Sequence, residues 1–181
     1  MTRRAVFLDR DGTLNVRPDG HRYVETLERF VWLPGAVEGA SVLARAGFVL
    51  AVASNQRGIA RGLVSWSTIA AIEQEIQARL GEQGVQIAAF RYCPHELDDA
   101  CDCRKPAPGM LLELAELLDL DLARSWMVGD SASDVAAGHA AGCSTALIAP
   151  ATAGSPFADL VAPSLRAAAA AILEREALSR P

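Results

Sequence analysis

The stretch AVFLDRDGTLN, residues 5–15, decides how the rest of the chain is interpreted. It begins with a short apolar run, typical of a buried β-strand, that ends at an aspartate. Asp9 and Asp11 stand two residues apart, and Gly12 allows a sharp turn behind them. Such a pair either shares a hard divalent cation or divides into a nucleophile and a general acid–base. An isolated pair of this kind more often only caps backbone amides, so its interpretation depends on the other strand ends.

Short apolar runs alternate with segments of helical period along the chain. We predict buried strands over 5–9, 48–54, 88–93, 125–130 and 144–149. We predict helices over 34–47, 67–84, 108–120, 133–142 and 164–176, with Ser67 capping the second and Ser164 the last. Strands that are apolar throughout and alternate with helices are typical of a parallel sheet covered on both faces. We therefore expect an α/β fold, a three-layer α/β/α sandwich around a central parallel sheet, as one domain over residues 1–181.

Polar or metal-binding side chains stand at the carboxyl ends of four predicted strands. These residues are Asp9, Ser54, Cys93 and Asp130. In parallel sheets the binding crevice lies beyond the carboxyl ends of the strands. We therefore expect all four residues to gather along one edge of the sheet.

Groups suited to an anion stand near the same strand ends. Ser54 offers a hydroxyl and an amide, and Asn55 offers another amide. Arg104 and Lys105 precede a predicted helix, and Lys105 is the only lysine among 17 basic residues. A compact ammonium at this one place is suited to an oxyanion.

Two acids follow the fourth predicted strand. Asp130 ends the strand, and Asp134 stands four residues later near the next helix start. One of them would complete a magnesium site with the acids of the first strand. Asp134 is either a direct ligand or a helix cap and partner behind the ligands.

Three of the four cysteines and one of the three histidines lie within eleven residues. They form the pattern C-x-H-x5-C-x-C, made by Cys93, His95, Cys101 and Cys103. A Cys3His set can close a tetrahedral structural zinc site. Disulfides are the alternative, but Cys101 and Cys103 are poorly placed to bridge each other. We expect zinc here, and we interpret the separate Cys143 as a small buried apolar residue.

The overall composition narrows the class of partner. The net charge is −5, and 51% of the residues are hydrophobic. An acidic chain argues against a nucleic-acid or anionic membrane surface as its main partner. The apolar runs are also too short for a signal peptide or a membrane span. We expect a cytoplasmic monomer that meets a small anionic substrate through a local cluster of positive charge.

Together, FLDRDGTLN, SNQRGIARG, CRKP and MVGDSASD resemble the four motifs of the haloacid-dehalogenase-type phosphatases. The resemblance implies a Rossmann-like sheet, and no inserted cap domain is visible in the sequence. It implies that Asp9 is the nucleophile and Asp11 the general acid–base. It implies magnesium on the Asp9 and Asp130 carboxylates and the Asp11 carbonyl, and phosphoryl oxygens on Ser54 and Lys105.

The segment CPHELDDACDCRKP resembles the zinc loop, here residues 93–103, of two phosphatase families. One removes the 7-phosphate of D-glycero-D-manno-heptose 1,7-bisphosphate, and the other acts on histidinol phosphate. GIARG, WLPGA and KPAPGMLLE are similar to the first family, and Arg104 suits a second phosphate. The alternatives are a phosphatase for histidinol phosphate or another small sugar phosphate, and a non-catalytic zinc-stabilised binding module.

Three features depart from the heptose pattern. The segment 16–24 is longer than expected, Ser54 stands where threonine is more familiar, and Ser131 stands where lysine is common. The lysine would add a positive contact. Three arginines near the motifs could supply this positive charge instead, namely Arg17, Arg22 and Arg57.

Overall fold

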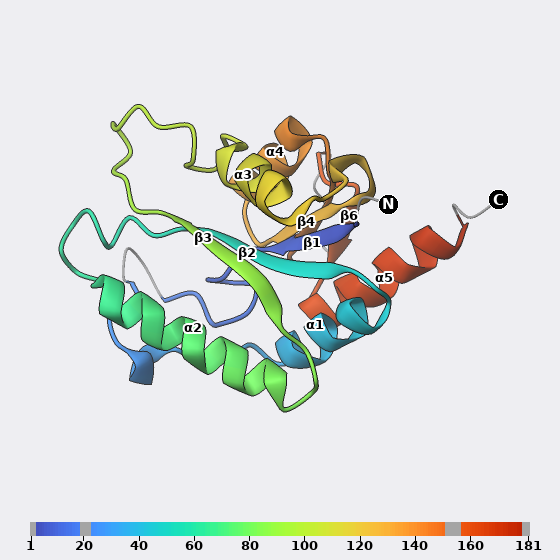
Figure 1. Cartoon of the computed structure of the whole chain (residues 1–181), viewed down its shortest axis with the longest axis horizontal. Helices are drawn as coiled ribbons and strands as arrows, with labels where there is room; N and C mark the ends of the chain where they lie inside the picture. Colours follow the sequence, from blue (N-terminus) through green and yellow to red (C-terminus); the bar gives the residue numbers. More distant parts are fainter. Residues whose placement is uncertain (1–2, 19–22, 151–156, 179–181) are drawn as a thin grey trace.

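The computed structural model describes residues 3–18, 23–150 and 157–178. Its centre is a six-stranded sheet in the order β3-β2-β1-β4-β5-β6, and all paired strands are parallel (Figure 1). The strands are β1 (Ala5–Leu8), β2 (Val49–Asn55), β3 (Ile87–Cys93), β4 (Trp126–Gly129), β5 (Ser144–Ile148) and β6 (Leu160–Ala162). The predicted three-layer architecture is confirmed.

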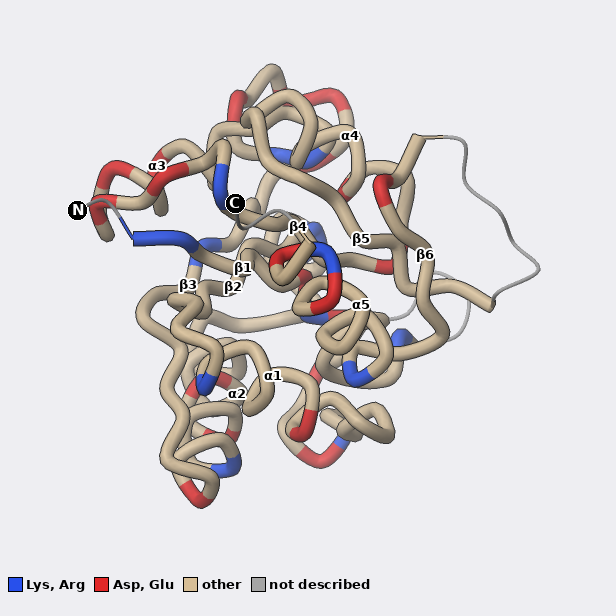
Figure 2. Tube along the Cα trace, turned by 90° about the vertical axis from the view of Figure 1, so that its right-hand side faces the viewer, with Lys and Arg blue, Asp and Glu red and all other residues tan. Residues whose placement is uncertain are grey.

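Helices cover both faces of this sheet. They are α1 (Ala36–Arg45), α2 (Trp66–Gly81), α3 (Gly109–Leu118), α4 (Ala132–Ala141) and α5 (Leu165–Leu178). Figures 1 and 2 show α3 and α4 on one side and α1, α2 and α5 on the other. Two short 3-10 turns, η1 (Leu27–Arg29) and η2 (Leu122–Arg124), complete the described elements.

Strand β1 is buried on both faces, which explains its unbroken apolar sequence. Val6 and Leu8 belong to the core beneath α1, α2 and α5, whereas Phe7 belongs to the core beneath α3 and α4. Successive side chains of a strand point to opposite faces, so one strand supplies both cores. The strand that carries the paired acids therefore lies at the centre of the molecule.

Two predictions about the elements need correction. Helix α2 is capped by Ser65, whose Oγ accepts a hydrogen bond from the Thr68 amide at 3.0 Å, and not by Ser67. The helix starts earlier because Trp66 and Ser67 already have helical geometry. Strand β6 was not predicted, because three residues are too few for a periodic pattern. The cap at Ser164 is confirmed by its hydrogen bond from the Ala167 amide at 3.2 Å.

The carboxyl ends of β1, β2, β3 and β4 lie side by side at one edge. Strand β1 lies between β2 and β4, and β3 flanks β2. The loops that follow β2 and β3 both leave the sheet at its left end in Figure 1. Part of the unusual 16–24 segment, residues 19–22 with Arg22, lies outside the described residues.

The surface carries charges of both signs. Acidic and basic positions are interspersed over the helices in the view of Figure 2. Within the described ranges, none of the helices is long and apolar enough to cross a membrane.

Helix α1 approaches α5 closely at Gly39. A Cβ atom at this glycine would lie 2.6 Å from the Leu165 carbonyl carbon and 2.7 Å from the Arg166 nitrogen. Backbone atoms cannot move aside as the end of a flexible side chain can. The close packing of the two helices therefore requires glycine here.

We predict that Gly39→Ala lowers the free energy of unfolding by about 1–3 kcal/mol, the usual cost of overpacking. Gly81→Ala is the matched control, because Gly81 also lies in a helix but has nothing within 4 Å of an added Cβ. Alanine there should be neutral or stabilising by up to about 1 kcal/mol. Urea unfolding of both variants measures the difference, and equal stability would contradict the packing argument.

Candidate active site

A buried lysine between two buried acids forms the floor of the candidate site. Lys105 Nζ lies 2.8 Å from Asp9 Oδ1 and 2.6 Å from Asp134 Oδ1, and it donates to the Ala53 carbonyl at 2.7 Å. All three charged side chains are at most 6% exposed. Burial disfavours the charged lysine, but the two carboxylates outweigh it and raise the pKa of Lys105. The lysine therefore stays cationic beside Asp9.

The side chain of Asn55 fixes the backbone of Lys105. Its Nδ2 donates to the Lys105 carbonyl and its Oδ1 accepts from the Lys105 amide, both at 3.0 Å. Both polar atoms of the Asn55 side chain are thus bonded to Lys105. The contact with an anion that we expect from Asn55 would therefore be made by its backbone N–H group. The contact joins the end of β2 to the loop that carries the lysine.

Asp11 is held by side chains that the sequence analysis did not single out. The fully buried Arg10 donates to both Asp11 carboxylate oxygens, at 3.1 and 3.0 Å. Gln56 and Asn15 donate to the same carboxylate at 2.8 and 2.9 Å. Burial pushes the pKa of Asp11 upward, but Arg10 and these hydrogen bonds outweigh it and lower the pKa. Asp11 is therefore kept ionised in this arrangement.

Asp130 closes the other side of the site. The backbone of Gly12 passes so near that an added Cβ would lie 1.9 Å from Asp130 Oδ2, and Gly12 has a φ of 96°. Asp130 Oδ1 lies 2.5 Å from the Arg17 guanidinium. Burial is the largest cause that raises the pKa of Asp130 to about 7, and the charge of Arg17 opposes it.

Oxygen atoms at this place are suited to a hard divalent cation. The carboxylates of Asp9, Asp130 and Asp134 each offer an oxygen within 4.8 Å of the others. The guanidinium of Arg17 lies against Asp130 and 3.3 Å from the Asp11 carbonyl, so a cation already occupies part of this oxygen cluster. The donor set fits Mg²⁺, which prefers carboxylate and carbonyl oxygen.

Asp134 caps the start of α4 and pairs with Lys105. Its Oδ2 accepts hydrogen bonds from the Ser131 amide and hydroxyl, at 3.0 and 2.6 Å, and its Oδ1 pairs with Lys105. It thereby completes a capping box at the start of α4. Of the two roles left open by the sequence, the structure favours the cap. Lys105 outweighs burial and lowers the pKa of Asp134.

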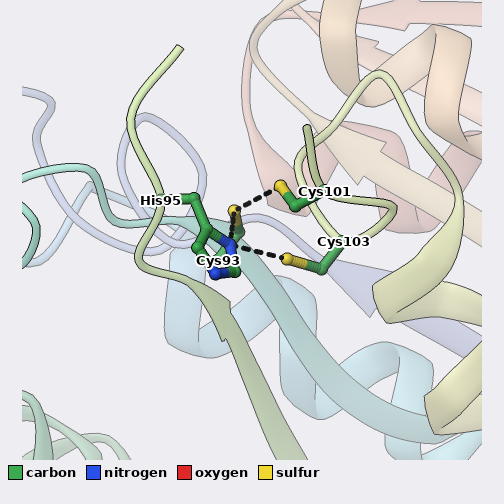
Figure 3. Close-up of side chains that lie close together, drawn as sticks. All are labelled: Cys93, His95, Cys101 and Cys103. Atoms are coloured by element: carbon green, nitrogen blue, oxygen red, sulfur yellow. Dashed lines mark hydrogen bonds between the residues drawn. The ribbon is translucent and has the colours of Figure 1, made fainter. Parts of the chain in front are cut away.

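The four predicted zinc ligands converge in space (Figure 3). Cys93 Sγ lies 3.8 Å from Cys101 Sγ and 3.5 Å from His95 Nδ1, which lies 3.2 Å from Cys103 Sγ. A tetrahedral site with Zn–S near 2.3 Å and Zn–N near 2.1 Å has edges of about 3.6–3.8 Å. Burial, followed by the neighbouring sulfur atoms, raises the pKa of Cys103 to about 12. The arrangement fits a cation at its centre that would stabilise the thiolates.

A cavity of about 450 Å³ lies beside Asp9 and Asp11, and Leu97 of the 93–103 loop contributes to its lining. Arg104 donates to the His95 carbonyl at 3.3 Å, and Glu96 lies 3.8 Å from Arg57. Arg57 also donates to the Tyr23 hydroxyl at 3.1 Å. The cavity is lined by Asp9, Asp11, Arg17, Pro18, Tyr23, Ser54, Asn55, Arg57, Leu97, Arg104, Lys105, Ser131, Ser133 and Asp134.

The structure thus brings the predicted catalytic and anion-binding residues to one cavity. Asp130 does not line the cavity but pairs with Arg17, which does, and the cysteine–histidine cluster is separate from the lining. Arg10, Asn15 and Gln56 were missed. A signal existed for Arg10, because an arginine that directly follows a buried strand between two acids needs an anionic partner. Gln56 and Asn15 carry no comparable signal, since polar residues are common in loops.

Comparisons with known proteins agree with this geometry. A family model described as HAD-hydrolase-like matches residues 102–168. A curated D-glycero-beta-D-manno-heptose-1,7-bisphosphate 7-phosphatase from Pseudomonas aeruginosa is 38% identical over 180 residues, which are 96% of this chain and 100% of the relative.

Solved structures give the same result. The D,D-heptose 1,7-bisphosphate phosphatase from B. bronchiseptica, complexed with magnesium and phosphate, has a TM-score of 0.86 at 35% identity and covers 95% of this chain and 99% of its own. A putative HAD-like phosphatase from Mesorhizobium loti has a TM-score of 0.82 at 34% identity and covers 99% of this chain and 89% of its own. The chain therefore belongs to the D-glycero-beta-D-manno-heptose-1,7-bisphosphate 7-phosphatase family of HAD-like hydrolases.

Proposed function

We propose that the chain hydrolyses the 7-phosphate of D-glycero-beta-D-manno-heptose 1,7-bisphosphate and leaves the heptose 1-phosphate. The observation that carries the proposal is the buried Asp9 carboxylate, paired with Lys105 at 2.8 Å on the floor of a cavity that also contains three arginines. The names of the full-length relatives supply the substrate and its anomer.

In the first half-reaction, an Asp9 oxygen attacks the phosphorus of the 7-phosphate. A new P–O bond forms to Asp9, and the bond from phosphorus to the sugar oxygen breaks. The leaving alkoxide takes a proton from Asp11. Because Arg10, Gln56 and Asn15 favour the ionised form of this carboxylate, Asp11 must first take up a proton when the substrate binds. Lys105 and the Ser54 hydroxyl bind the phosphoryl oxygens, where negative charge is concentrated.

In the second half-reaction, water attacks the phosphorus of the aspartyl phosphate. Asp11, now ionised, accepts a proton from the water, and the bond between phosphorus and Asp9 breaks. Inorganic phosphate leaves, and both acids return to their starting states. The hydrogen bonds of Arg10, Gln56 and Asn15 support the ionised Asp11 that this step requires.

Magnesium would be held by the Asp9 and Asp130 carboxylates and by the Asp11 carbonyl, and it would neutralise charge on the phosphoryl group. Zinc would be held by Cys93, His95, Cys101 and Cys103 in a closed structural site. Its role is to fix the loop that positions Arg104 and Lys105.

The proposal also concerns the setting in which the chain works. We infer a cytoplasmic monomer with a sugar phosphate as its small-molecule partner; the cytoplasmic setting is supported by the four cysteines, none of which forms a disulfide. Reducing conditions preserve thiols as metal ligands.

We predict that the chain, with magnesium, prefers the beta anomer of the heptose bisphosphate over histidinol phosphate by at least a hundredfold in kcat/KM. This ratio corresponds to about 2.7 kcal/mol of transition-state discrimination. Phosphate release from both heptose anomers and from histidinol phosphate measures it.

Asp9→Asn serves as the blank, because an amide cannot act as the nucleophile. Phosphate release that persists in this variant would contradict the aspartyl-phosphate route. A preference for histidinol phosphate would contradict the substrate assignment, and no turnover of any phosphate ester would leave the non-catalytic zinc module as the better description.

We predict about one equivalent of zinc per chain in protein purified without added metal. Cys101→Ala should lose most of this zinc and lower the melting temperature, because structural zinc contributes directly to folding. Cys143→Ala is the matched control, since Cys143 is a buried cysteine outside the cluster. Metal analysis and thermal unfolding measure both effects. Less than half an equivalent in the unmodified chain, or equal zinc in the two variants, would contradict the site.

A further inference from the structure

Arg17 lies on the oxygen atoms that the proposed magnesium site needs. Its guanidinium donates to Asp130 Oδ1 at 2.5 Å and, among the contacts that the structure describes, to no other carboxylate. The Nε and one terminal nitrogen each lie 3.3 Å from the Asp11 carbonyl oxygen. The side chain thus holds together the two strand-end loops that carry Asp11 and Asp130.

A guanidinium and a divalent cation that bind the same oxygen atoms repel each other. An Mg²⁺ ion binds its oxygen ligands at about 2.0–2.1 Å. The carbonyl of Asp11 and the carboxylate of Asp130 would then place the ion and the Arg17 guanidinium within a few ångströms of each other. Two positive charges this close repel strongly in a partly buried site. Binding of the ion at these oxygens would therefore drive the guanidinium away.

The side chain of Arg17, once displaced from Asp130, can extend into the cavity. Arg17 is 52% exposed and lines the same cavity of about 450 Å³ as Arg57 and Arg104. Those two arginines donate to Tyr23 and to the His95 carbonyl, and neither of these partners is a candidate ligand of the magnesium site. Arg17 is different because its carboxylate partner is itself a candidate metal ligand.

The position after Asp130 does not supply a competing charge. Ser131 is uncharged, and its hydroxyl donates to Asp134 at 2.6 Å. A substrate phosphate that approaches this side of the cavity would therefore meet the positive charge of Arg17. A guanidinium can bind a phosphate through two parallel hydrogen bonds.

We propose that Arg17 is a specificity-determining residue that the metal releases. Before the metal binds, Arg17 neutralises Asp130; afterwards, it binds the phosphate of the bisphosphate that is not hydrolysed. The second part rests on the proposed function, whereas the exchange at Asp130 does not. Binding of the second phosphate by Arg17 thus requires that the metal site be occupied first.

The first test measures metal binding without substrate. The zinc-loaded chain, free of magnesium, is titrated with MgCl₂ in a calorimeter. Arg17→Gln should bind Mg²⁺ at least threefold more tightly, because the ion no longer displaces a guanidinium. Arg61→Gln is the matched control: it removes the same charge from a side chain that pairs with Glu96 and should change the affinity less than twofold. Equal or weaker Mg²⁺ binding by Arg17→Gln, or the same gain in Arg61→Gln, would overturn the exchange.

The second test measures specificity at saturating magnesium. The ratio of kcat/KM for the heptose bisphosphate to that for the heptose 7-phosphate, which lacks the second phosphate, should fall at least tenfold in Arg17→Gln. The loss should come mainly from a higher KM for the bisphosphate. Arg61→Gln should keep the ratio within twofold. An unchanged ratio in Arg17→Gln would overturn the phosphate contact. If the unmodified chain hydrolyses neither substrate, the proposed function is wrong. The calorimetric test still decides whether Mg²⁺ displaces Arg17 from Asp130, because it uses no substrate.

Discussion

The buried ion pairs of Lys105 with Asp9 and Asp134 are the constraint on which the site depends. Removing charges from water costs several kcal/mol per ion, and their mutual attraction repays this only with good geometry and additional hydrogen bonds. Here the Ala53 carbonyl supplies such a hydrogen bond, and Asn55 fixes the lysine backbone from both sides. The ion pairs therefore form only when four elements are correctly positioned relative to one another: β1, β2, the loop after β3 and the start of α4. The three charges act as one unit, and loss of any member leaves the others uncompensated.

Most of the fold could be predicted from the sequence because buried parallel strands leave an unambiguous apolar pattern. Strand β1 shows this well, since its four residues are all buried. The prediction failed where the segment was too short to show a pattern, as in the three residues of β6. It also failed at the start of α2, where two serines stand two residues apart and only the backbone path decides that Ser65 is the cap.

The candidate site could be predicted as a set of residues but not as a set of contacts. Strand ends placed Asp9, Ser54 and Asp130 at one edge, because parallel order alone determines that edge. Side-chain partners depend on packing that no local pattern records. The place of Arg10 between two acids signals an acidic partner nearby, and Arg10 indeed bonds to Asp11. Arg17 pairs with Asp130, which is far away in the sequence, and no local signal indicates that partner.

The long sequence separation within the ion-paired unit has a consequence for the chain during its synthesis. Asp9 emerges early, but Lys105 follows 96 residues later and Asp134 later still. Until α4 has docked, Asp9 is an ordinary hydrated carboxylate without its cationic neighbour. A nascent or truncated chain therefore lacks the ion-paired carboxylate on which the proposed reaction depends. The arrangement of charges at the site is thus tied to completion of the fold, since its members come from the beginning, the middle and the last third of the chain.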